Sequence, residues 1–138
     1  ALELTDAERD SETIRIAGLR DRLVKELQRQ LDGVVETVPS ERKVAGSAHV
    51  CIEGVESEAL LFLLDEADVC ASAASACASG AMEPSHVLAA MGLDRALSAG
   101  ALRMTLGRTT TEADVDRASD VIVTAVCRLR RGAAGSDR

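Results

Sequence analysis

Hydrophobic residues recur at steps of three and four along residues 12–32, and this spacing predicts an amphipathic helix. Charged and amide side chains fill the positions between them, so the opposite face of the helix is expected to be solvated. The apolar positions are Ile16, Leu19, Leu23, Leu27 and Leu31. Gly33 follows, and a glycine there is typical of a helix C-terminus. The acidic stretch at residues 1–10 has no helix start signal, which suggests that the chain was cut from a longer one.

Three shorter segments have the composition or the alternation of β-strands. Residues 34–38 are mostly β-branched and end at a Pro-Ser turn, and residues 48–52 alternate up to a Glu-Gly turn. In residues 101–106, apolar and polar side chains alternate, which predicts a strand with one buried face and one wet or functional face. The apolar residues are Leu102, Met104 and Leu106, and the polar ones are Arg103 and Thr105. Residues 68–71 are a candidate fourth strand.

Three more helices are predicted further along the chain. Residues 56–66 place four apolar side chains on one side, which is typical of a short helix buried on that side. A second helix is expected to start at residues 83–85, because proline and an acidic residue both suit a first turn, and to end at Gly92. Residues 109–114 form a strong N-cap region, and the helix after them is expected to end at Arg131.

This alternation of short strands with helices predicts an α/β (α+β) sandwich, that is, a small mixed or antiparallel sheet covered by helices. The 138 residues, 46% of them hydrophobic, are enough for one modest domain with a real core. Phe62 is the only aromatic residue, so aliphatic side chains must build that core, and no stacking platform for bases or sugars is expected. The tail at residues 132–138 is expected to be disordered.

Charge and hydropathy argue against two classes of partner. The net charge is −7, whereas a nucleic-acid surface needs clustered Lys and Arg. The one cluster is Arg128, Arg130 and Arg131. It lies at the C-terminal end of a predicted helix, where the helix dipole favours positive side chains. No stretch approaches the roughly 20 apolar residues that cross a bilayer, and no signal peptide is apparent. We therefore expect no nucleic-acid or membrane partner and a cytoplasmic location.

The four cysteines contain no Cys-x-x-Cys pair, and the two histidines lie far apart, so neither a metal site nor a disulfide framework is predicted. Cys51 and Cys127 fall at apolar-compatible positions of a strand and a helix and are expected to be packing residues. Cys70 is ambiguous. Glycine-rich phosphate-binding motifs do not occur in the sequence.

Residues 70–81 are twelve consecutive Ala, Ser, Cys or Gly residues, with Cys77 near the middle. A segment with nothing large to bury is expected to form a mobile loop. Cys77 is a candidate nucleophile, because N–H groups at the start of the following helix would lower its thiol pKa. The alternative is that Cys77 is a small residue tolerated among Ala and Ser. His86 follows, but no third group orients a Cys-His pair, and we interpret His86 as structural.

Arg103 is the second candidate, because its side chain is expected to point away from those of Leu102 and Met104. A guanidinium in that position can hold a carboxylate through two parallel hydrogen bonds, which suits an amino-acid substrate. The alternative is an ordinary surface arginine. Arg108 is a weaker candidate, and we expect it to cap or pair with the next helix.

Five motifs occur in a fixed order between residues 53 and 112, and the pattern to which they belong covers nearly the whole chain. They are EGVESEAL at 53–60, ASACAS at 74–79, MEPSHVL at 82–88, LRMTLGR at 102–108 and TTE at 110–112. In that order and spacing they resemble the C-terminal part of a cysteine desulfurase, a NifS/IscS-like member of the class V aminotransferases. These are pyridoxal-phosphate enzymes that take sulfur from cysteine for iron–sulfur cluster and thio-cofactor assembly.

The resemblance implies a fold like the C-terminal domain of fold-type I pyridoxal-phosphate enzymes, and a reaction that converts L-cysteine to L-alanine. It implies that Cys77 attacks the sulfur of the cofactor-bound substrate and becomes a persulfide, and that Arg103 binds the substrate α-carboxylate. The loop at residues 70–82 would then carry the sulfur to an acceptor such as an iron–sulfur scaffold protein. The resemblance also implies a homodimer for the complete enzyme.

The chain departs from the family pattern at two points. Ala74 stands where the family usually has a glycine, so the loop would be strained or differently shaped if a positive φ is needed there. The only lysines are Lys25 and Lys43, and neither matches the family's cofactor lysine, which lies in a larger domain that precedes this region. No cofactor-binding residue is therefore assigned in this chain.

From these motifs we interpret residues 1–32 as a helix that leads in from a missing larger domain, and residues 33–131 as a small C-terminal domain. Such a fragment is expected to be inactive alone. The alternative function is a stand-alone sulfur-carrier or interaction module in which Cys77 receives persulfide sulfur from a partner. A degenerate remnant without activity is the third possibility.

Overall fold

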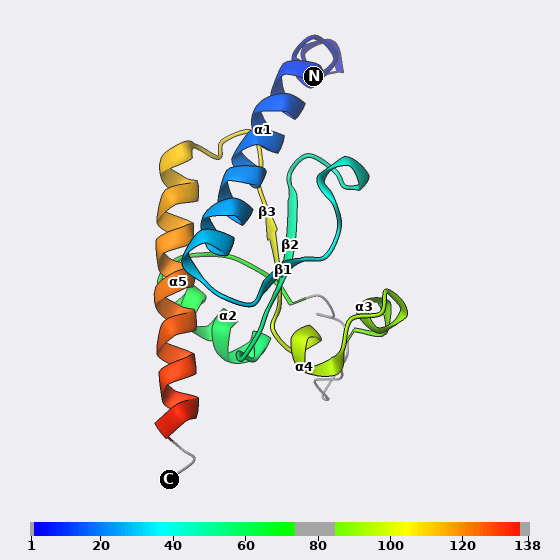
Figure 1. Cartoon of the computed structure of the whole chain (residues 1–138). Coiled ribbons are helices and arrows are strands. Elements are labelled where there is room, and N and C mark those ends of the chain that lie inside the picture. The colour runs from blue at the N-terminus through cyan, green and yellow to red at the C-terminus, as the bar shows by residue number, and fades with distance from the viewer. Residues whose placement is uncertain (1, 74–84, 136–138) are drawn as a thin grey trace.

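The structure is a computed structural model that describes residues 2–73 and 85–135. Helices lie before, between and after the strands of a single sheet along the chain (Figure 1). The helices are α1 (Leu2–Gln30), α2 (Ser57–Asp65), α3 (His86–Ala90), α4 (Arg95–Ser98) and α5 (Glu112–Gly135), with a 3-10 turn at Ser40–Arg42. The strands are β1 (Val34–Glu36), β2 (Ser47–Ile52) and β3 (Ala101–Thr105).

The three strands form an antiparallel sheet in the order β1-β2-β3. Val34 pairs with Ile52 across β1 and β2, and Val50 pairs with Leu102 across β2 and β3. Successive side chains of a strand point to opposite faces, so this register brings Val50, Leu102 and their alternate neighbours onto one face. The predicted α+β architecture with a small sheet covered by helices is confirmed, and the sheet is antiparallel.

The long helices α1 and α5 lie side by side and cover that face of the sheet, which we call the inner face (Figure 1). The predicted stripe of α1 is confirmed, because its leucines are buried against the sheet and α5. Leu27, Val50, Leu102, Ile122 and Val126 are all fully buried in this core. Burial of such aliphatic side chains contributes about 1.5–3 kcal/mol each, so the α1–sheet–α5 sandwich is the main source of stability.

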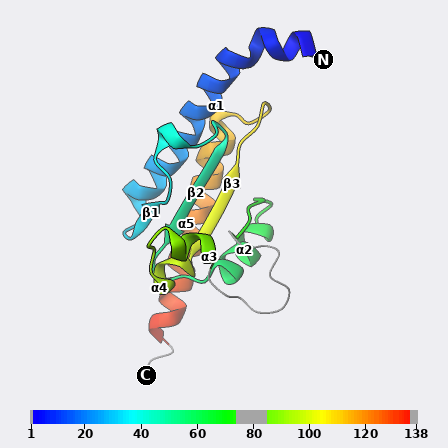
Figure 2. The same cartoon turned by 90° about the vertical axis from the view of Figure 1, so that its right-hand side faces the viewer.

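The opposite face, which we call the outer face, is covered only in part. In Figure 2 the strands lie in front of α1 and α5, and α3 and α4 cover one end of the sheet. There Leu88 packs with Cys51 and Ala101 in a small second core. Further along β2 and β3, the outer face carries His49, Arg103 and other polar side chains. This face therefore has an apolar end and a polar end.

The structure departs from the sequence predictions at three points. α1 begins at Leu2 rather than near residue 12. The strand expected over residues 68–71 is absent, because Asp68 has a φ of 56° and only a single bridge at Ser72 follows. α5 continues through Gly135, so residues 132–135 are helical rather than part of a disordered tail.

The predicted N-cap region before α5 is confirmed. The Asp114 carboxylate accepts hydrogen bonds from the backbone N–H of Thr111 (2.8 Å) and from its hydroxyl (2.7 Å), and the Asp114 N–H donates to the Thr111 hydroxyl at 3.2 Å. This reciprocal arrangement satisfies N–H groups that a helix leaves without a partner at its start.

Within residues 2–73 and 85–135, no helix combines the length and the apolar character needed to cross a membrane.

Candidate functional site

Four polar residues form a row across the outer face of the sheet, and we call them the outer row: Thr37, His49, Arg103 and Ser72. His49 on β2 pairs in register with Arg103 on β3. On one side of this pair, the Thr37 N–H donates to the His49 carbonyl at 3.2 Å. On the other side, Ser72 and Arg103 exchange two backbone hydrogen bonds of 3.0 and 2.7 Å. Backbone bonds therefore hold all four residues at fixed positions.

Arg103 has the orientation that the sequence predicts. Its neighbours Leu102 and Met104 are buried on the inner face, whereas Arg103 is exposed on the outer face. Its Nη2 donates a long hydrogen bond of 3.4 Å to the Ser72 hydroxyl. Among the ion pairs between described residues, none involves Arg103. A guanidinium with most of its donors still available can bind a carboxylate through two parallel hydrogen bonds.

His49 is a member of the outer row that the sequence analysis missed. Its Nδ1 lies 2.8 Å from the Thr37 hydroxyl oxygen. Burial lowers the pKa of His49, and the nearby charge of Arg103 lowers it further, so both effects favour the neutral ring. The alternation of residues 48–52 placed His49 on one face of a strand, but only the register shows that this face carries Arg103.

Cys77 lies outside the residues that the structure describes, as does most of the expected loop at 70–82. The outer row nevertheless marks the point from which that segment starts. Ser72 is five residues before Cys77 in the sequence and is bonded to Arg103 through its backbone. Ser72 therefore joins Arg103, on the edge strand β3, to the part of the sequence that leads to Cys77.

The other cysteines divide into one buried and two exposed residues. Cys51 is fully buried as predicted, and burial raises the pKa of its thiol to about 11. Cys127 is exposed, so the prediction that it is a packing residue is wrong. α5 turns it away from the sheet, between the buried positions Ala125 and Val126 and the exposed Arg128. Cys70, which was ambiguous from the sequence, is exposed.

Arg108 and His86 take no part in the outer row. Arg108 forms an ion pair with Glu8 of α1 at 2.9 Å, rather than with the helix that follows it. His86 is the first residue of α3 and is exposed rather than packed in the core. Within the described part of the chain, no group of three or more His, Cys, Asp or Glu side chains could hold a metal ion.

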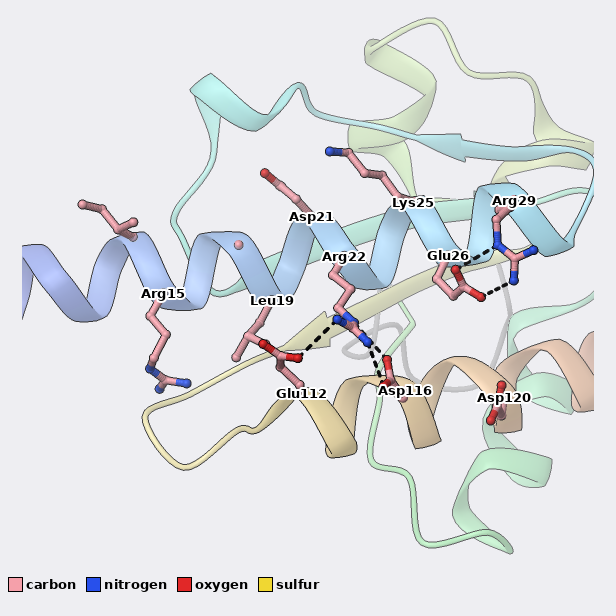
Figure 3. A pocket seen from close by; sticks show the side chains of 12 residues that line it. Arg15, Leu19, Asp21, Arg22, Lys25, Glu26, Arg29, Glu112, Asp116 and Asp120 are labelled. Atoms are coloured by element: carbon pink, nitrogen blue, oxygen red, sulfur yellow. Dashed lines mark hydrogen bonds and ion pairs between the residues drawn. The ribbon is translucent and has the colours of Figure 1, made fainter.

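A charged groove runs along the opposite side of the molecule, between α1 and the first half of α5 (Figure 3). Arg22 of α1 pairs there with Asp116 at 2.8 Å and with Glu112 at 3.3 Å. Arg29 pairs with Glu26 at 2.6 Å. The exposed ion pairs of Arg22 join the two helices, whereas the Arg29–Glu26 pair lies within α1, so we interpret the groove as a helix–helix contact and not as a second site.

The lysines do not fit a covalently held pyridoxal phosphate. Lys43 is largely buried and forms an ion pair with the Glu36 carboxylate. Burial and the charge of Arg20 lower the pKa of Lys43. Lys25 is exposed on α1 and lines the groove between α1 and α5, behind the sheet as seen from the outer row. The chain has no other lysine, so no lysine is both exposed and placed at the outer row.

Comparison with known proteins gives a consistent result. The aminotransferase class-V family model matches residues 2–118. An IscS-like cysteine desulfurase from Mycobacterium tuberculosis is 44% identical to this chain over 133 residues, and a cysteine desulfurase from Gluconacetobacter diazotrophicus is 40% identical over 130 residues. Each alignment covers 94% of this chain but only 34% and 32% of the relative. The chain thus spans about a third of the length of these relatives.

Solved structures with the same fold carry similar names. A NifS-like protein superposes with a TM-score of 0.75 at 25% identity, over 91% of this chain and 31% of that chain. A NifS-like protein from Rickettsia africae superposes with a TM-score of 0.71 at 22% identity, and this second likeness concerns the fold alone. The small antiparallel sheet with its covering helices is therefore a fold already seen in NifS-like proteins.

Proposed function

This chain belongs to the aminotransferase class-V family, and from that premise we propose that it is the C-terminal portion of a pyridoxal-phosphate-dependent cysteine desulfurase. The observation that carries the proposal is the placement of Arg103, an exposed arginine without an acidic partner among the described residues, next to the start of the segment that contains Cys77. The relatives named cysteine desulfurase, at 40–44% identity, support the same reaction.

Arg103 has the role of binding the α-carboxylate of L-cysteine. Its side chain leaves the outer face from a strand whose other face is buried in the core, so the guanidinium is held on a rigid element. The planar fork of its N–H groups matches a carboxylate, and this match orients the amino acid as well as binding it.

Cys77 has the role of accepting the sulfur. Its thiol forms a new bond to the sulfur of L-cysteine, the carbon–sulfur bond of the substrate breaks, and the products are L-alanine and a Cys77 persulfide. An acceptor such as an iron–sulfur scaffold protein then takes the outer sulfur atom. Residues 70–82 consist mostly of small side chains, which suits a segment that moves between substrate and acceptor.

The chain alone does not turn over cysteine in this proposal. The cofactor would supply the electron sink for cleavage of the carbon–sulfur bond, but Lys25 and Lys43 are not placed to hold it. The residues that bind the cofactor are instead expected in the part of the relatives' length that this chain does not span. As a complete enzyme the protein would act as a homodimer.

The test uses L-cysteine labelled with radioactive sulfur and two forms of the protein. The first is the 138-residue chain. The second also contains the residues encoded immediately upstream of Ala1. With pyridoxal phosphate present, we expect the extended form to release L-alanine and to carry label on Cys77 that a reductant removes. Cys77→Ser abolishes this label, and Cys51→Ser is the matched control because Cys51 is buried.

Three results would contradict the proposal or part of it. Robust sulfide release by the 138-residue chain would show that the chain is not dependent on a missing domain. A chain that takes labelled sulfur onto Cys77 only from a separate, complete desulfurase would instead support the stand-alone sulfur carrier. Undiminished labelling of the Cys77→Ser variant would rule out both functions.

A further inference from the structure

His49 and Arg103 are a cross-strand pair, and their backbone bonds show which kind of pair they form. The N–H and C=O of Arg103 are bonded to Ser72, and the C=O of His49 accepts from Thr37. These groups point away from the other member of the pair, so the pair is of the non-hydrogen-bonded kind. In such pairs the Cα atoms are about 4.5 Å apart and the side chains are closest. The imidazole and the guanidinium therefore leave the same face at its narrowest spacing.

Thr37 orients the imidazole. Its hydroxyl oxygen is 2.8 Å from Nδ1 and 3.4 Å from the carbonyl oxygen of His49. A hydroxyl has one proton, and we assign it to the shorter of the two contacts, the one to Nδ1. With that proton donated to Nδ1, the neutral ring carries its own proton on Nε2. The ring nitrogen that Thr37 does not engage is then a hydrogen-bond donor.

The charges around the ring favour its neutral form. Arg103 on β3 is the charged group beside it, and like charges directly opposite each other on a sheet are destabilising. Thr37 and Ser72 on the neighbouring segments are uncharged, and the thiol of Cys51, on the same face of β2, has a pKa of about 11 and is neutral. Arg103 and His49 thus form one cation and one neutral donor side by side.

We propose that His49 is a second carboxylate-binding residue, which donates a hydrogen bond from Nε2 to the same carboxylate that Arg103 holds, with Thr37 as the positioning residue for the ring. The identity of that carboxylate as the α-carboxylate of an amino acid rests on the proposed function. A bound carboxylate also offsets the positive charge beside the ring, so carboxylate binding and proton uptake by His49 are coupled.

The experiment is a nuclear magnetic resonance titration of the 138-residue chain, which has only two imidazoles. His49 is half-buried beside Arg103, and His86 is exposed on α3 and is the internal control. Acetate is the probe, because it presents a carboxylate and nothing else. We expect acetate to shift the His49 ring signals saturably and to raise the His49 pKa, with no saturable effect on His86. In Arg103→Gln, the pKa of His49 is higher before acetate is added, and the acetate effect is lost.

Two variants show whether His49 donates a hydrogen bond to the bound acetate or only lies near it. His49→Gln keeps an N–H donor but cannot titrate, so it should bind acetate with an affinity that no longer depends on pH between 6 and 8, where acetate stays ionised. His49→Ala should bind roughly fivefold more weakly, the effect of losing one hydrogen bond. Three outcomes would overturn the inference. Acetate could shift the Arg103 guanidinium signals without shifting those of His49, or His49→Ala could bind acetate with the wild-type affinity. The third is that no response to acetate depends on Arg103.

These measurements need neither the cofactor nor sulfur transfer. If Cys77 of the extended protein takes no label while the His49 response is intact, the proposed function fails and the carboxylate site stands. If Cys77 is labelled normally while His49 does not respond to acetate, only the role of His49 is overturned.

Discussion

Ser72 and Arg103 form an isolated antiparallel bridge: the Ser72 N–H donates to the Arg103 carbonyl at 3.0 Å, and the Arg103 N–H donates to the Ser72 carbonyl at 2.7 Å. β3 has β2 on its other side, so this bridge is what occupies the free edge of β3 at Arg103. The bridge therefore fixes the backbone of Arg103, the candidate carboxylate-binding residue. It also fixes the start of the segment that leads to Cys77.

Ser72→Pro should loosen this edge, because proline has no N–H to donate to the Arg103 carbonyl. We expect hydrogen exchange at the Arg103 amide to become roughly fivefold faster or more, as for the loss of about one hydrogen bond. Exchange at Leu102, which faces β2 and the core, should stay as in the unmodified chain. The measurement is amide exchange followed by nuclear magnetic resonance.

Ser72→Ala is the matched control, because it keeps both backbone bonds and removes only the hydroxyl at 3.4 Å from Arg103 Nη2. Its Arg103 amide should exchange at the original rate. Equal rates in Ser72→Pro and Ser72→Ala would mean that the bridge contributes nothing to the order of this edge.

Cys51 should be the slowest of the described thiols to alkylate. Burial raises its pKa to about 11, and the thiolate is the reactive form. At pH 8 only about one thiol in a thousand would be ionised at that pKa, and the thiolate fraction rises tenfold for each pH unit up to it. We expect iodoacetamide at pH 8 to modify the exposed Cys70 and Cys127 first, as read by peptide mass spectrometry.

Unfolding provides the control for this comparison. In guanidinium chloride Cys51 loses its burial between the sheet and α3, so all three thiols should react at similar rates. Modification of Cys51 in the folded chain as fast as that of Cys70 would contradict the burial of Cys51.

The sequence predicted those parts of the fold that depend on local periodicity. The leucines of α1 and the alternation around Arg103 set which side chains are buried, and the structure confirms both. The outward orientation of Arg103 could therefore be predicted before any contact was known. The N-cap at Thr111 was likewise predictable, because a capping box is local.

Features that depend on contacts between distant segments could not be predicted in this way. His49 becomes part of the site only through the register that pairs it with Arg103, 54 residues later in the sequence. The expected strand at 68–71 fails because the backbone turns at Asp68, whose positive φ is uncommon for a residue with a side chain. Arg130 looked like a charge for the end of a helix, yet it donates to the carbonyls of Asp32 and Glu53 and joins α5 to two turns.

Gly100→Ala should destabilise the junction between α4 and β3. A Cβ at Gly100 would overlap the carbonyl of Ile52, and the Ile52 N–H donates to the Gly100 carbonyl at 3.0 Å, so the two segments cannot separate without losing that bond. We expect the free energy of unfolding to fall by about 1–3 kcal/mol, as for overpacking elsewhere. Urea unfolding followed by circular dichroism measures it.

Gly18→Ala is the opposite case and serves as the control. Gly18 lies on the exposed side of α1 with no atom near the position of a Cβ, so alanine should stabilise the helix by about 1 kcal/mol. A stabilising Gly100→Ala, or the same sign for both variants, would contradict the close approach of Gly100 to Ile52.

Arg103→Lys tests the proposed substrate role in the form of the protein that is extended upstream of Ala1. Lysine keeps the positive charge and extends from the same strand, but it lacks the fork that binds both carboxylate oxygens. We expect the KM for L-cysteine to rise roughly tenfold, as for the loss of one charge-assisted hydrogen bond, with steady-state production of L-alanine as the measurement. Arg108→Lys is the matched control, because Arg108 pairs with Glu8 at 2.9 Å and takes no part in the outer row. If both variants changed the KM equally, the effect would not depend on where the guanidinium is lost, and Arg103 would have no specific part in binding the carboxylate.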